Sequence, residues 1–462
     1  MNAARALYSL LTWCAQPLLR RKLRRRAVAE PGYALAVGER FGRYPQPIDS
    51  LMPHSSMNMM GRFVWIHAVS LGETRAAAIL VTALRAQWPD MRLLLTHSTA
   101  TGRAEGEKFL HPGDVQVWLP WDTPGAVARF LRKFKPAIGV LMETEVWPNL
   151  VAGCRKYGVP LVLANARFNE KSLAKAQRVA ALARPAYSGL SAAWAQTEDD
   201  ASRLRLLGTK VRGVFGNLKF DVVPDASQLA QGRAWRATSA RPVVLLASSR
   251  EGEEALWLDV LKQKKALALV HQAQPAINSE AGADAPITTS VSGVQWLIVP
   301  RHPQRFDEVA ALLTRAGLRV SRRSQWHATP PAAAEADVWL GDSLGEMVLY
   351  YGVADVALLG GSFAPLGGQN LIEAAACGCP VVMGPHTFNF AQAADAACSA
   401  GAAQRVADMA QGVPAACDWA SAPQRLAVGR TQALQFAQSH RGAAERTAHA
   451  LADVLAANRG RE

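Results

Sequence analysis

The stretch from Asp337 to Pro385 reads DVWLGDSLGEMVLYYGVADVALLGGSFAPLGGQNLIEAAACGCPVVMGP. It contains three short apolar runs, each bounded by Gly, Asp or Pro: Val338–Leu340, Val356–Leu359 and Val381–Met383. Such runs are typical of buried parallel strands. The segments between them, Leu344–Tyr351 and Asn370–Cys377, are predicted helices. This alternation predicts a nucleotide-binding half of a doubly wound α/β sheet.

The loop after the second of these strands is rich in glycine, with the pairs Gly360-Gly361 and Gly367-Gly368. Glycine lets a backbone approach a ligand closely. Asn370 stands where the next helix begins, so backbone N–H groups there suit a phosphate. Glu373, in the first turn, can accept hydrogen bonds from ribose hydroxyls. Asn370 and Glu373 could equally cap the helix; the four glycines favour a ligand site.

The alternation of strand and helix continues through most of the chain. Further strands are predicted at Phe63–Val69, Arg92–Thr96, Val115–Leu119, Ala137–Met142, Pro160–Ala164, Ala192–Gln196, Val211–Phe215, Pro242–Ala247 and Trp296–Pro300. We therefore expect an α/β fold with two Rossmann-like, doubly wound domains that face a cleft, at residues 27–224 and 225–462. Residues 262–294 have no clear periodicity and many small or turn-forming residues. They predict a flexible surface insertion in the second domain.

The first 26 residues, MNAARALYSLLTWCAQPLLRRKLRRR, join an apolar run to a basic block. The run Ala6–Leu19 is shorter than the roughly 20 residues that span a bilayer as a helix, and Gln16 and Pro17 interrupt it. Six Lys and Arg residues follow within positions 20–26. This order predicts a segment, 1–26, that attaches to the cytoplasmic face of an anionic membrane. The alternative is an amphipathic helix packed on the protein itself, with solvated arginines.

The composition suits two globular domains, because the 462 residues are 50% hydrophobic. A formal charge of +14 favours an anionic partner such as nucleic acid, acidic lipid or a phosphorylated substrate, although a generic basic surface would also explain it. The six cysteines form no CxxC pair. This excludes the usual zinc-binding spacing and indicates reduced thiols.

Three charged residues of the first half follow predicted strands, at the edge of the sheet where ligands bind. Glu73 could take a proton from an attacking hydroxyl. Glu143 could hold a substrate hydroxyl or stabilise developing charge. Lys219 could stabilise a leaving phosphate. Each has a structural alternative, because Glu73 would also stabilise a first helical turn, one of Glu143 and Glu145 would cap a helix, and Lys219 could be solvated.

In the second half, Arg301 follows a strand within VPRHPQRF and offers a planar fork of donors to a phosphate. Leu344-Gly345-Glu346 occupies another junction between a strand and a helix. Together with Asn370–Glu373, these junctions would converge on one nucleotide.

Several common motifs are absent from the chain. No GxGxxG follows the first strand, which gives little support to a nicotinamide-dependent dehydrogenase. There is no GxxxxGK[ST] and no HExxH, and no DxD-type pair stands at a strand end. Metal dependence is therefore not indicated, because arginine, lysine and helix N-termini can neutralise a phosphate.

Six segments occur in order along the chain: SLGE, METEVWPN, GNLKFD, PRHPQRF, SLGEM and GGQNLIEAA. Together they resemble the 3-deoxy-D-manno-octulosonic acid (Kdo) transferases, which are glycosyltransferases with two Rossmann-like domains (the B type). The resemblance extends from the N-terminal segment to about residue 400. The insertion at 262–294 is the one departure, and it affects no expected catalytic residue.

The resemblance implies an inverting transfer of Kdo from CMP-Kdo to the lipid A precursor (lipid IVA), in lipopolysaccharide biosynthesis. It implies Glu73 as general base, Glu143 in the active site and Lys219 as a stabiliser of the transition state. The expected CMP-binding residues are Pro300, Arg301, Leu344, Gly345, Glu346, Asn370, Leu371, Ile372 and Glu373. No metal or other cofactor is expected. The expected location is the cytoplasmic side of the inner membrane, with no nucleic acid partner.

Two other classes of function stay open at this point. A different nucleotide-sugar enzyme of the same architecture, such as an epimerase, would need no lipid acceptor. A basic protein that only binds membranes or nucleic acid would bind anions with a steep salt dependence and show no turnover.

Overall fold

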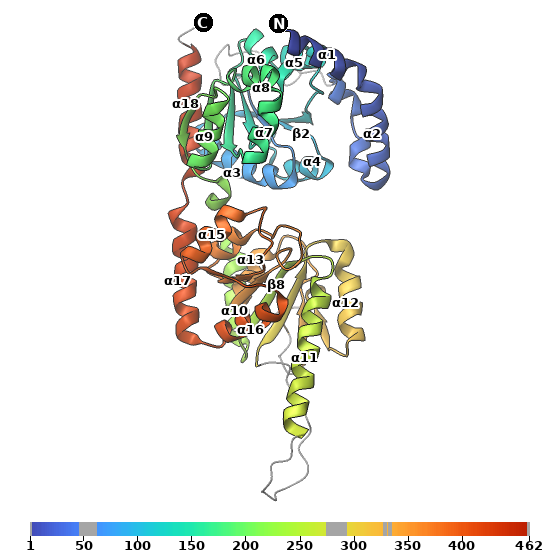
Figure 1. The fold of residues 1–462 in the computed structure, drawn as a ribbon, viewed down its shortest axis with the longest axis vertical. Helices are drawn as coiled ribbons and strands as arrows, with labels where there is room; N and C mark the ends of the chain where they lie inside the picture. Colours follow the sequence, from blue (N-terminus) through green and yellow to red (C-terminus); the bar gives the residue numbers. More distant parts are fainter. Residues whose placement is uncertain (1, 46–61, 274–292, 327–329, 331–334, 460–462) are drawn as a thin grey trace, which may run out of the picture. The chain divides into compact units, whose positions relative to one another are not determined.

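The computed structural model describes residues 2–45, 62–273, 293–326, 330 and 335–459. The chain forms two compact units (Figure 1). Unit 1 contains residues 1–221 and 440–462, and unit 2 contains 222–439. Each unit is built on its own parallel sheet, so the prediction of two Rossmann-like domains is confirmed. The predicted boundary needs one correction: the sequence assigns all of 225–462 to the second domain, whereas 440–462 lies in unit 1.

The sheet of unit 1 has seven strands in the order β3-β2-β1-β4-β5-β6-β7, and all pairs are parallel. These strands are β1 Phe63–His67, β2 Arg92–His97, β3 Val115–Trp118, β4 Ile138–Met142, β5 Leu161–Ala166, β6 Ala192–Ala195 and β7 Val211–Val214. Continuous apolar runs let the central strands lie between two layers of helices. Strand order reverses between β1 and β4, which is the switch point where doubly wound sheets bind ligands.

Helices cover both faces of this sheet (Figure 1). They are α1 Ala3–Cys14, α2 Gln16–Ala29, α3 Leu71–Gln87, α4 Ala100–Gly106, α5 Pro124–Phe134, α6 Pro148–Lys156, α7 Glu170–Arg178, α8 Ala180–Tyr187, α9 Glu198–Leu206 and α18 Ala443–Arg459. One core cluster lies under α5, α6 and α8, and another lies under α3 and α18.

Unit 2 has a second parallel sheet in the order β10-β11-β9-β8-β12-β13-β14. Its strands are β8 Val243–Ser249, β9 Gln295–Pro300, β10 Val320–Arg322, β11 Val338–Leu340, β12 Val356–Leu359, β13 Val381–Met383 and β14 Ala403–Arg405. Its helices are α10 Ala226–Thr238, α11 Glu253–Ala273, α12 Phe306–Arg315, α13 Met347–Val353, α14 Leu371–Ala376, α15 Ala391–Ser399, α16 Met409–Ala420 and α17 Pro423–Ser439. Helix α11 continues through residue 273, so the predicted insertion at 262–294 begins as helix. Residues 274–292 of that insertion lie outside the described residues.

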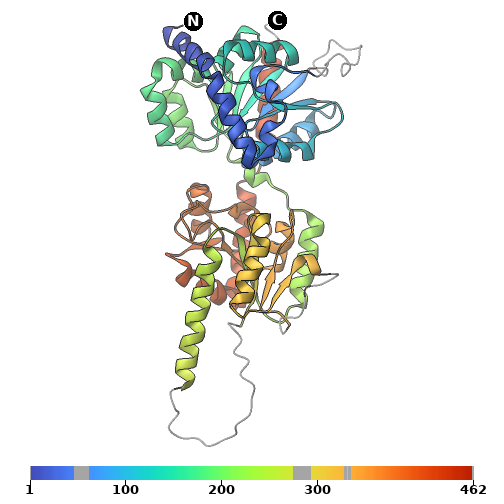
Figure 2. The ribbon, with the colours of Figure 1, turned by 90° about the vertical axis from the view of Figure 1, so that its right-hand side faces the viewer.

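The N-terminal segment forms two helices along one side of unit 1, drawn in blue in Figure 2. Asn2 Nδ2 donates to the carbonyl of Ala181 at 2.9 Å, and Ser9 Oγ donates to Asn149 Oδ1 at the same distance. For the polar face of α1, the alternative prediction of an amphipathic helix packed on the protein itself is therefore confirmed. No helix among the described residues has the length and apolar character needed to cross a bilayer.

The last helix, α18, completes unit 1 from the other end of the chain. The Asp221 carboxylate accepts backbone N–H bonds from Gly442 and Ala444, both at 2.5 Å, and so caps the helix start. Leu451 is fully buried in the same core cluster as β1 and α3. The Ala-rich C-terminus has no sequence motif of its own, but its apolar side supplies part of a core.

Because α18 supplies part of the core of unit 1, we expect its buried residues to contribute to stability. Leu451→Ala should lower the free energy of unfolding by roughly 2–5 kcal/mol, because it removes a fully buried side chain and leaves a cavity. Urea denaturation followed by circular dichroism measures this loss. Asp453→Ala, at an exposed position of the same helix, is the matched control and should change stability by less than about 0.5 kcal/mol. Equal stability of both variants would contradict the placement of α18 in the core.

Candidate active site

Two carboxylates flank the switch point of unit 1. Strands β1 and β4 pair with Ile66 opposite Val140 and His67 opposite Leu141, so their carboxyl ends are level. Glu73 stands in the first turn of α3, which follows β1, and Glu143 comes directly after β4. The register therefore brings both residues to the edge where a doubly wound sheet binds its ligand.

Glu73 combines a structural contact with an altered acidity. Its carboxylate accepts the Val69 N–H at 2.9 Å and the Ser70 hydroxyl at 3.1 Å, so it helps to cap α3 as the structural alternative predicts. Burial raises the pKa of Glu73 to about 7, and the neighbouring carboxylates of Glu143 and Glu145 act in the same direction. A carboxylate with a pKa near neutrality is well matched to general-base catalysis.

Glu143 and Lys219 form an ion pair beside Glu73. Lys219 Nζ lies 3.4 Å from Glu143 Oε1, and both side chains are largely shielded from solvent. Glu143 has a φ of 59°, an unusual conformation for a residue with a side chain. Its backbone N–H donates to Ala164, and its carbonyl accepts from the N–H of Arg167, so β5 holds it in place. Such strained residues cluster at functional sites.

Asn165 positions the lysine and was not identified from the sequence. It also has a positive φ, 52°, where the pairing of β5 with β6 is irregular. Its Oδ1 accepts the N–H of Leu218 at 3.0 Å, which fixes the short 3-10 helix Leu218–Asp221 that carries Lys219. An asparagine within an apolar strand is the signal that sequence reasoning could have used, because a buried amide needs hydrogen-bond partners.

In unit 2, Arg301 lies beside the glycine-rich loop. Ala247 pairs with both Val299 and Leu359, so the carboxyl ends of β8, β9 and β12 are level. Arg301 follows β9 directly, and its Nε donates to Gln369 Oε1 at 3.2 Å. The charges of Arg250 and Arg301 both contribute to a lowered pKa of His302, after the larger effect of its desolvation. This edge of the sheet therefore has a positive field that suits a phosphate.

The glycines of this loop have structural reasons of their own. A Cβ on Gly360 would lie 2.2 Å from the Ser248 carbonyl oxygen, and Gly361, Gly367 and Gly368 all have positive φ. The glycines alone therefore do not require a ligand, in contrast to the argument from sequence. Asn370 caps α14 by accepting the N–H of Ile372 at 3.2 Å.

A buried carboxylate that the sequence analysis did not single out holds the same loop. Glu253, which is fully buried, accepts N–H groups from Arg250 at 2.9 Å, Gly361 at 2.7 Å and Phe363 at 3.0 Å. The sequence signal was available, since Glu253 and Glu254 stand at the start of α11, in the fourth and fifth positions after the end of β8.

At the third predicted junction between a strand and a helix, Leu344–Glu346, polar groups already bond to other groups of the protein. Glu346 forms an ion pair with Arg323 at 2.8 Å and accepts a hydrogen bond from Ser343. The carbonyl of Gly345 accepts from Gln228 at 3.1 Å, and Leu344 is 72% exposed. The carboxylate of Glu346 thus already has a cationic partner. Its role in nucleotide binding stays a prediction.

Comparison of this chain with known protein sequences shows the family to which it belongs. Residues 36–222 match the family model of 3-deoxy-D-manno-octulosonic-acid transferase (kdotransferase). The chain is 47% identical over 401 residues to the 3-deoxy-D-manno-octulosonic acid transferase of Bordetella pertussis, covering 85% of this chain and 87% of that protein. This chain belongs to the Kdo transferase family. It is therefore a glycosyltransferase.

Two further likenesses agree with this family. The 3-deoxy-D-manno-octulosonic acid transferase of Haemophilus influenzae is 31% identical over 390 residues, which is 84% of this chain and 83% of that protein. A solved glycosyltransferase from Rickettsia africae has a TM-score of 0.52 at 11% identity and covers 85% of this chain and 99% of its own. At that identity it supports the fold alone.

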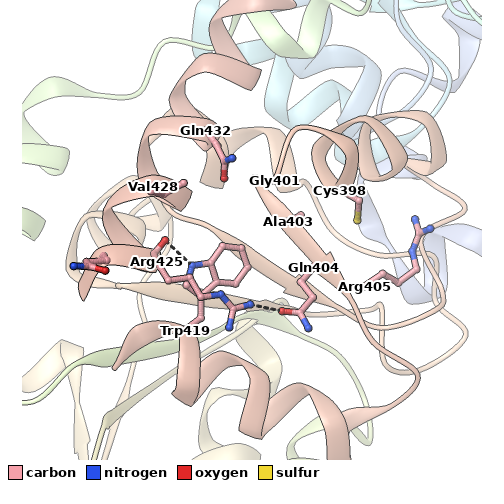
Figure 3. Close-up of a pocket in the computed structure, with 10 residues that line it drawn as sticks. Cys398, Gly401, Ala403, Gln404, Arg405, Trp419, Arg425, Val428 and Gln432 are labelled. Carbon is pink, nitrogen blue, oxygen red and sulfur yellow. Dashed lines mark hydrogen bonds between the residues drawn. The ribbon is translucent and has the colours of Figure 1, made fainter. Parts of the chain in front are cut away.

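One hollow of unit 2 lies apart from the predicted site of this Kdo transferase family member. Its volume is about 700 Å³, and it lies against the edge strand β14 (Figure 3). The guanidinium of Arg425 lies 4.8 Å from the ring centre of Trp419 and donates to Gln404 at 2.8 Å. None of the predicted CMP-binding residues lines it. No group of three or more His, Cys, Asp and Glu residues in the described ranges could hold a metal ion.

The pKa of Glu73 and the carboxylates near it predict how turnover depends on pH. Turnover that needs ionised Glu73 should rise with pH through about 7, the pKa of this residue. In Glu143→Gln, the loss of a nearby negative charge lowers the pKa of Glu73, so the acidic limb of kcat/KM should move to lower pH. Any simultaneous loss of rate does not obscure the position of the limb.

The control for this measurement is Glu170→Gln, which removes an exposed carboxylate at the start of α7. This variant should leave the acidic limb where it is in the unmodified protein. An unmoved limb in Glu143→Gln would mean that Glu73 does not govern the profile.

Proposed function

We propose that this chain transfers Kdo from CMP-Kdo to a hydroxyl group of the lipid A precursor, with inversion at the anomeric carbon. The observation that carries the proposal is Glu73, a carboxylate with a pKa of about 7 at the switch point of unit 1. Membership of the Kdo transferase family supports the choice of sugar. The lipid A acceptor and the inversion are what the resemblance to this family implies, and a general base at that edge fits attack by an acceptor hydroxyl.

In this mechanism Glu73 is the general base. It takes the proton of the acceptor hydroxyl as the oxygen attacks the anomeric carbon of Kdo. The bond between that carbon and the CMP phosphate breaks, and its electron pair leaves with CMP. Attack from the side opposite the leaving group in one step inverts the configuration. The Val69 and Ser70 contacts fix the orientation of the carboxylate and leave lone pairs on its oxygens.

The ion pair of Glu143 and Lys219 adjusts the charge around this base. Glu143 adds to the raised pKa of Glu73, which burial mainly causes, and Lys219 keeps a cation at the same edge. Kdo is itself an acid, so a lysine held in place by Asn165 and Glu143 can meet negative charge on the donor or its leaving group.

In unit 2, Arg301 and the loop that follows β12 are the proposed holders of CMP. Arg301 is oriented by Gln369, and its planar guanidinium matches the geometry of a phosphate. Asn370 and the first turn of α14, Leu371–Glu373, follow this loop and would meet the nucleoside. The side chains of Leu371 and Ile372 are buried, so these two residues would act through their backbone. Glu253 keeps this loop rigid through its buried contacts with backbone N–H groups.

The proposed location is the cytoplasmic side of the inner membrane. Helix α1 turns its polar face to the protein, and its apolar residues Leu7, Leu10, Leu11 and Trp13 are each between 57% and 64% exposed. The six basic residues at 20–26 of α2 are also exposed. An outward apolar face beside a row of cations suits the surface of an anionic bilayer.

The transfer reaction has a direct test. The protein is incubated with CMP-Kdo and a lipid A precursor, and mass spectrometry detects lipid that has gained Kdo. Glu73→Gln should lower this turnover by roughly a hundredfold or more, the usual scale for general-base catalysis. Its affinity for CMP, measured by calorimetry, should stay unchanged.

Arg301→Ala is the counterpart, and it should weaken CMP binding without unfolding the protein by circular dichroism. Near-normal turnover in Glu73→Gln would remove Glu73 from the mechanism. Unaltered CMP affinity in Arg301→Ala would place the nucleotide elsewhere in unit 2. A protein that makes no Kdo-lipid but converts a nucleotide sugar would support the epimerase alternative.

The membrane contact is tested with Leu10→Ser/Leu11→Ser. Because burial of a leucine contributes roughly 1.5–3 kcal/mol when complete, the partition coefficient onto anionic liposomes should fall at least about tenfold. Flotation of protein with vesicles measures it. Val179→Ser/Leu206→Ser removes two comparably exposed apolar residues of unit 1 and should leave binding unchanged. Equal flotation of the two double variants would place the membrane contact on another surface.

A further inference from the structure

A pocket of about 360 Å³ lies between α1, α6 and α8 of unit 1. Arg5 of α1 and Arg155 of α6 line it, and apolar side chains form much of the remaining wall, among them Val151, Leu182 and Pro185. The pocket thus offers two cations beside an apolar surface. That combination matches an amphiphile with an anionic head group.

The two arginines are available to a ligand. Within the part of the chain that the structure describes, neither guanidinium forms an ion pair with an acidic side chain. The Arg5 Nε is buried and has no hydrogen-bond partner there. An arginine near a helix interface that has no carboxylate partner is suited to a phosphate, which its planar fork can bind with two hydrogen bonds.

The contacts of α1 fix the geometry of this pocket. Asn2 donates to Ala181 of α8, and Ser9 donates to Asn149 of α6, so the helix is attached on both sides of Arg5. Arg5 and Ser9 are one helical turn apart and share the face that meets the protein. Leu7, Leu10 and Leu11 lie on the opposite face and are exposed. The pocket therefore opens beside the surface proposed to meet the bilayer.

The pocket differs from the place where chemistry is proposed. Helix α6 begins just after Glu143 and Glu145, at the carboxyl edge of the sheet, and in a parallel α/β unit such a helix runs back toward the opposite edge. Arg155 is in its last turn. The cationic pair therefore lies toward the edge away from Glu73, which argues against the reacting acceptor as the occupant.

We infer that this pocket binds one anionic phospholipid of the membrane, with the phosphate between Arg5 and Arg155 and part of an acyl chain against α6 and α8. The inference rests on the proposed attachment of α1 to the membrane. It adds a specific lipid site to that attachment, which would otherwise depend on apolar insertion and diffuse attraction alone. Occupancy would also fix the orientation of unit 1 on the bilayer.

The test uses the whole protein and the soluble lipid dihexanoyl-phosphatidylglycerol, below its micelle concentration, with binding followed by calorimetry. The unmodified protein should bind it saturably. Arg5→Gln/Arg155→Gln should weaken binding at least about tenfold, since each charged hydrogen bond contributes well over the energy of a neutral one. Arg212→Gln/Arg315→Gln removes the same amount of charge from exposed positions outside the pocket and outside the basic segment 20–26, and is the matched control.

A second variant fills the pocket and keeps both arginines. Ala152→Met projects from α6 into the same space and should also weaken binding, while circular dichroism confirms that the fold is intact. Dihexanoyl-phosphatidylcholine, which has no net charge, should bind at least about tenfold more weakly than the anionic lipid because it lacks the net anionic charge that two arginines favour.

Three results would overturn the inference: equal binding in the two double arginine variants, unchanged binding in Ala152→Met, or equal affinity for inorganic phosphate and the lipid. The last result would reveal a simple anion site. The measurement contains neither CMP-Kdo nor a lipid A precursor. A failure of the proposed transfer reaction would therefore leave its outcome unaffected.

Discussion

Parallel pairing with level strand ends is the constraint on which the chemistry of this protein depends. In unit 1, His67 pairs with Leu141, so the residues that follow β1 and β4 reach the same edge. In unit 2, Ala247 pairs with Val299 and Leu359, with the same effect on β8, β9 and β12. Because these strands are buried on both faces, the polar residues that chemistry requires can stand only beyond their ends. The raised pKa of Glu73 follows mainly from its burial at such an edge, and the carboxylates of Glu143 and Glu145 add to it.

Much of the fold could be predicted from the sequence, because buried parallel strands have a simple pattern. The predicted runs at Val338–Leu340, Val356–Leu359 and Val381–Met383 are β11, β12 and β13. The edge strands β10 and β14 are only three residues long and partly exposed, so their apolar signal is weak. The placement of α18 was assigned wrongly. Its contacts with α3 and with the short helix Leu218–Asp221 connect residues far apart in the sequence, so no local sequence pattern could predict them.

The candidate site could be predicted in part, and the reason lies in the kinds of residue involved. Glu73, Glu143 and Arg301 are charged residues directly after strands, which is a signal that a sequence displays. Asn165 and Glu253 act through backbone N–H groups of loops that are distant in the chain, so their roles require the folded structure. The glycines of the loop after β12 were over-interpreted from the sequence, where they favoured a ligand site. Their φ angles and close contacts already explain why these positions are glycine.

The hydrogen bonds between Asp221 and the start of α18 have a consequence for how the chain folds during synthesis. Unit 1 obtains its first segment before unit 2 and its last helix after it, so unit 2 is an insertion within unit 1. On a ribosome, which adds about 5–20 residues per second, unit 1 must wait for residues 222–439, nearly half of the chain, before its core closes. During that interval the face of α3 that packs on α18 is without its partner. The inserted unit can complete its own sheet first, although its sequence begins later.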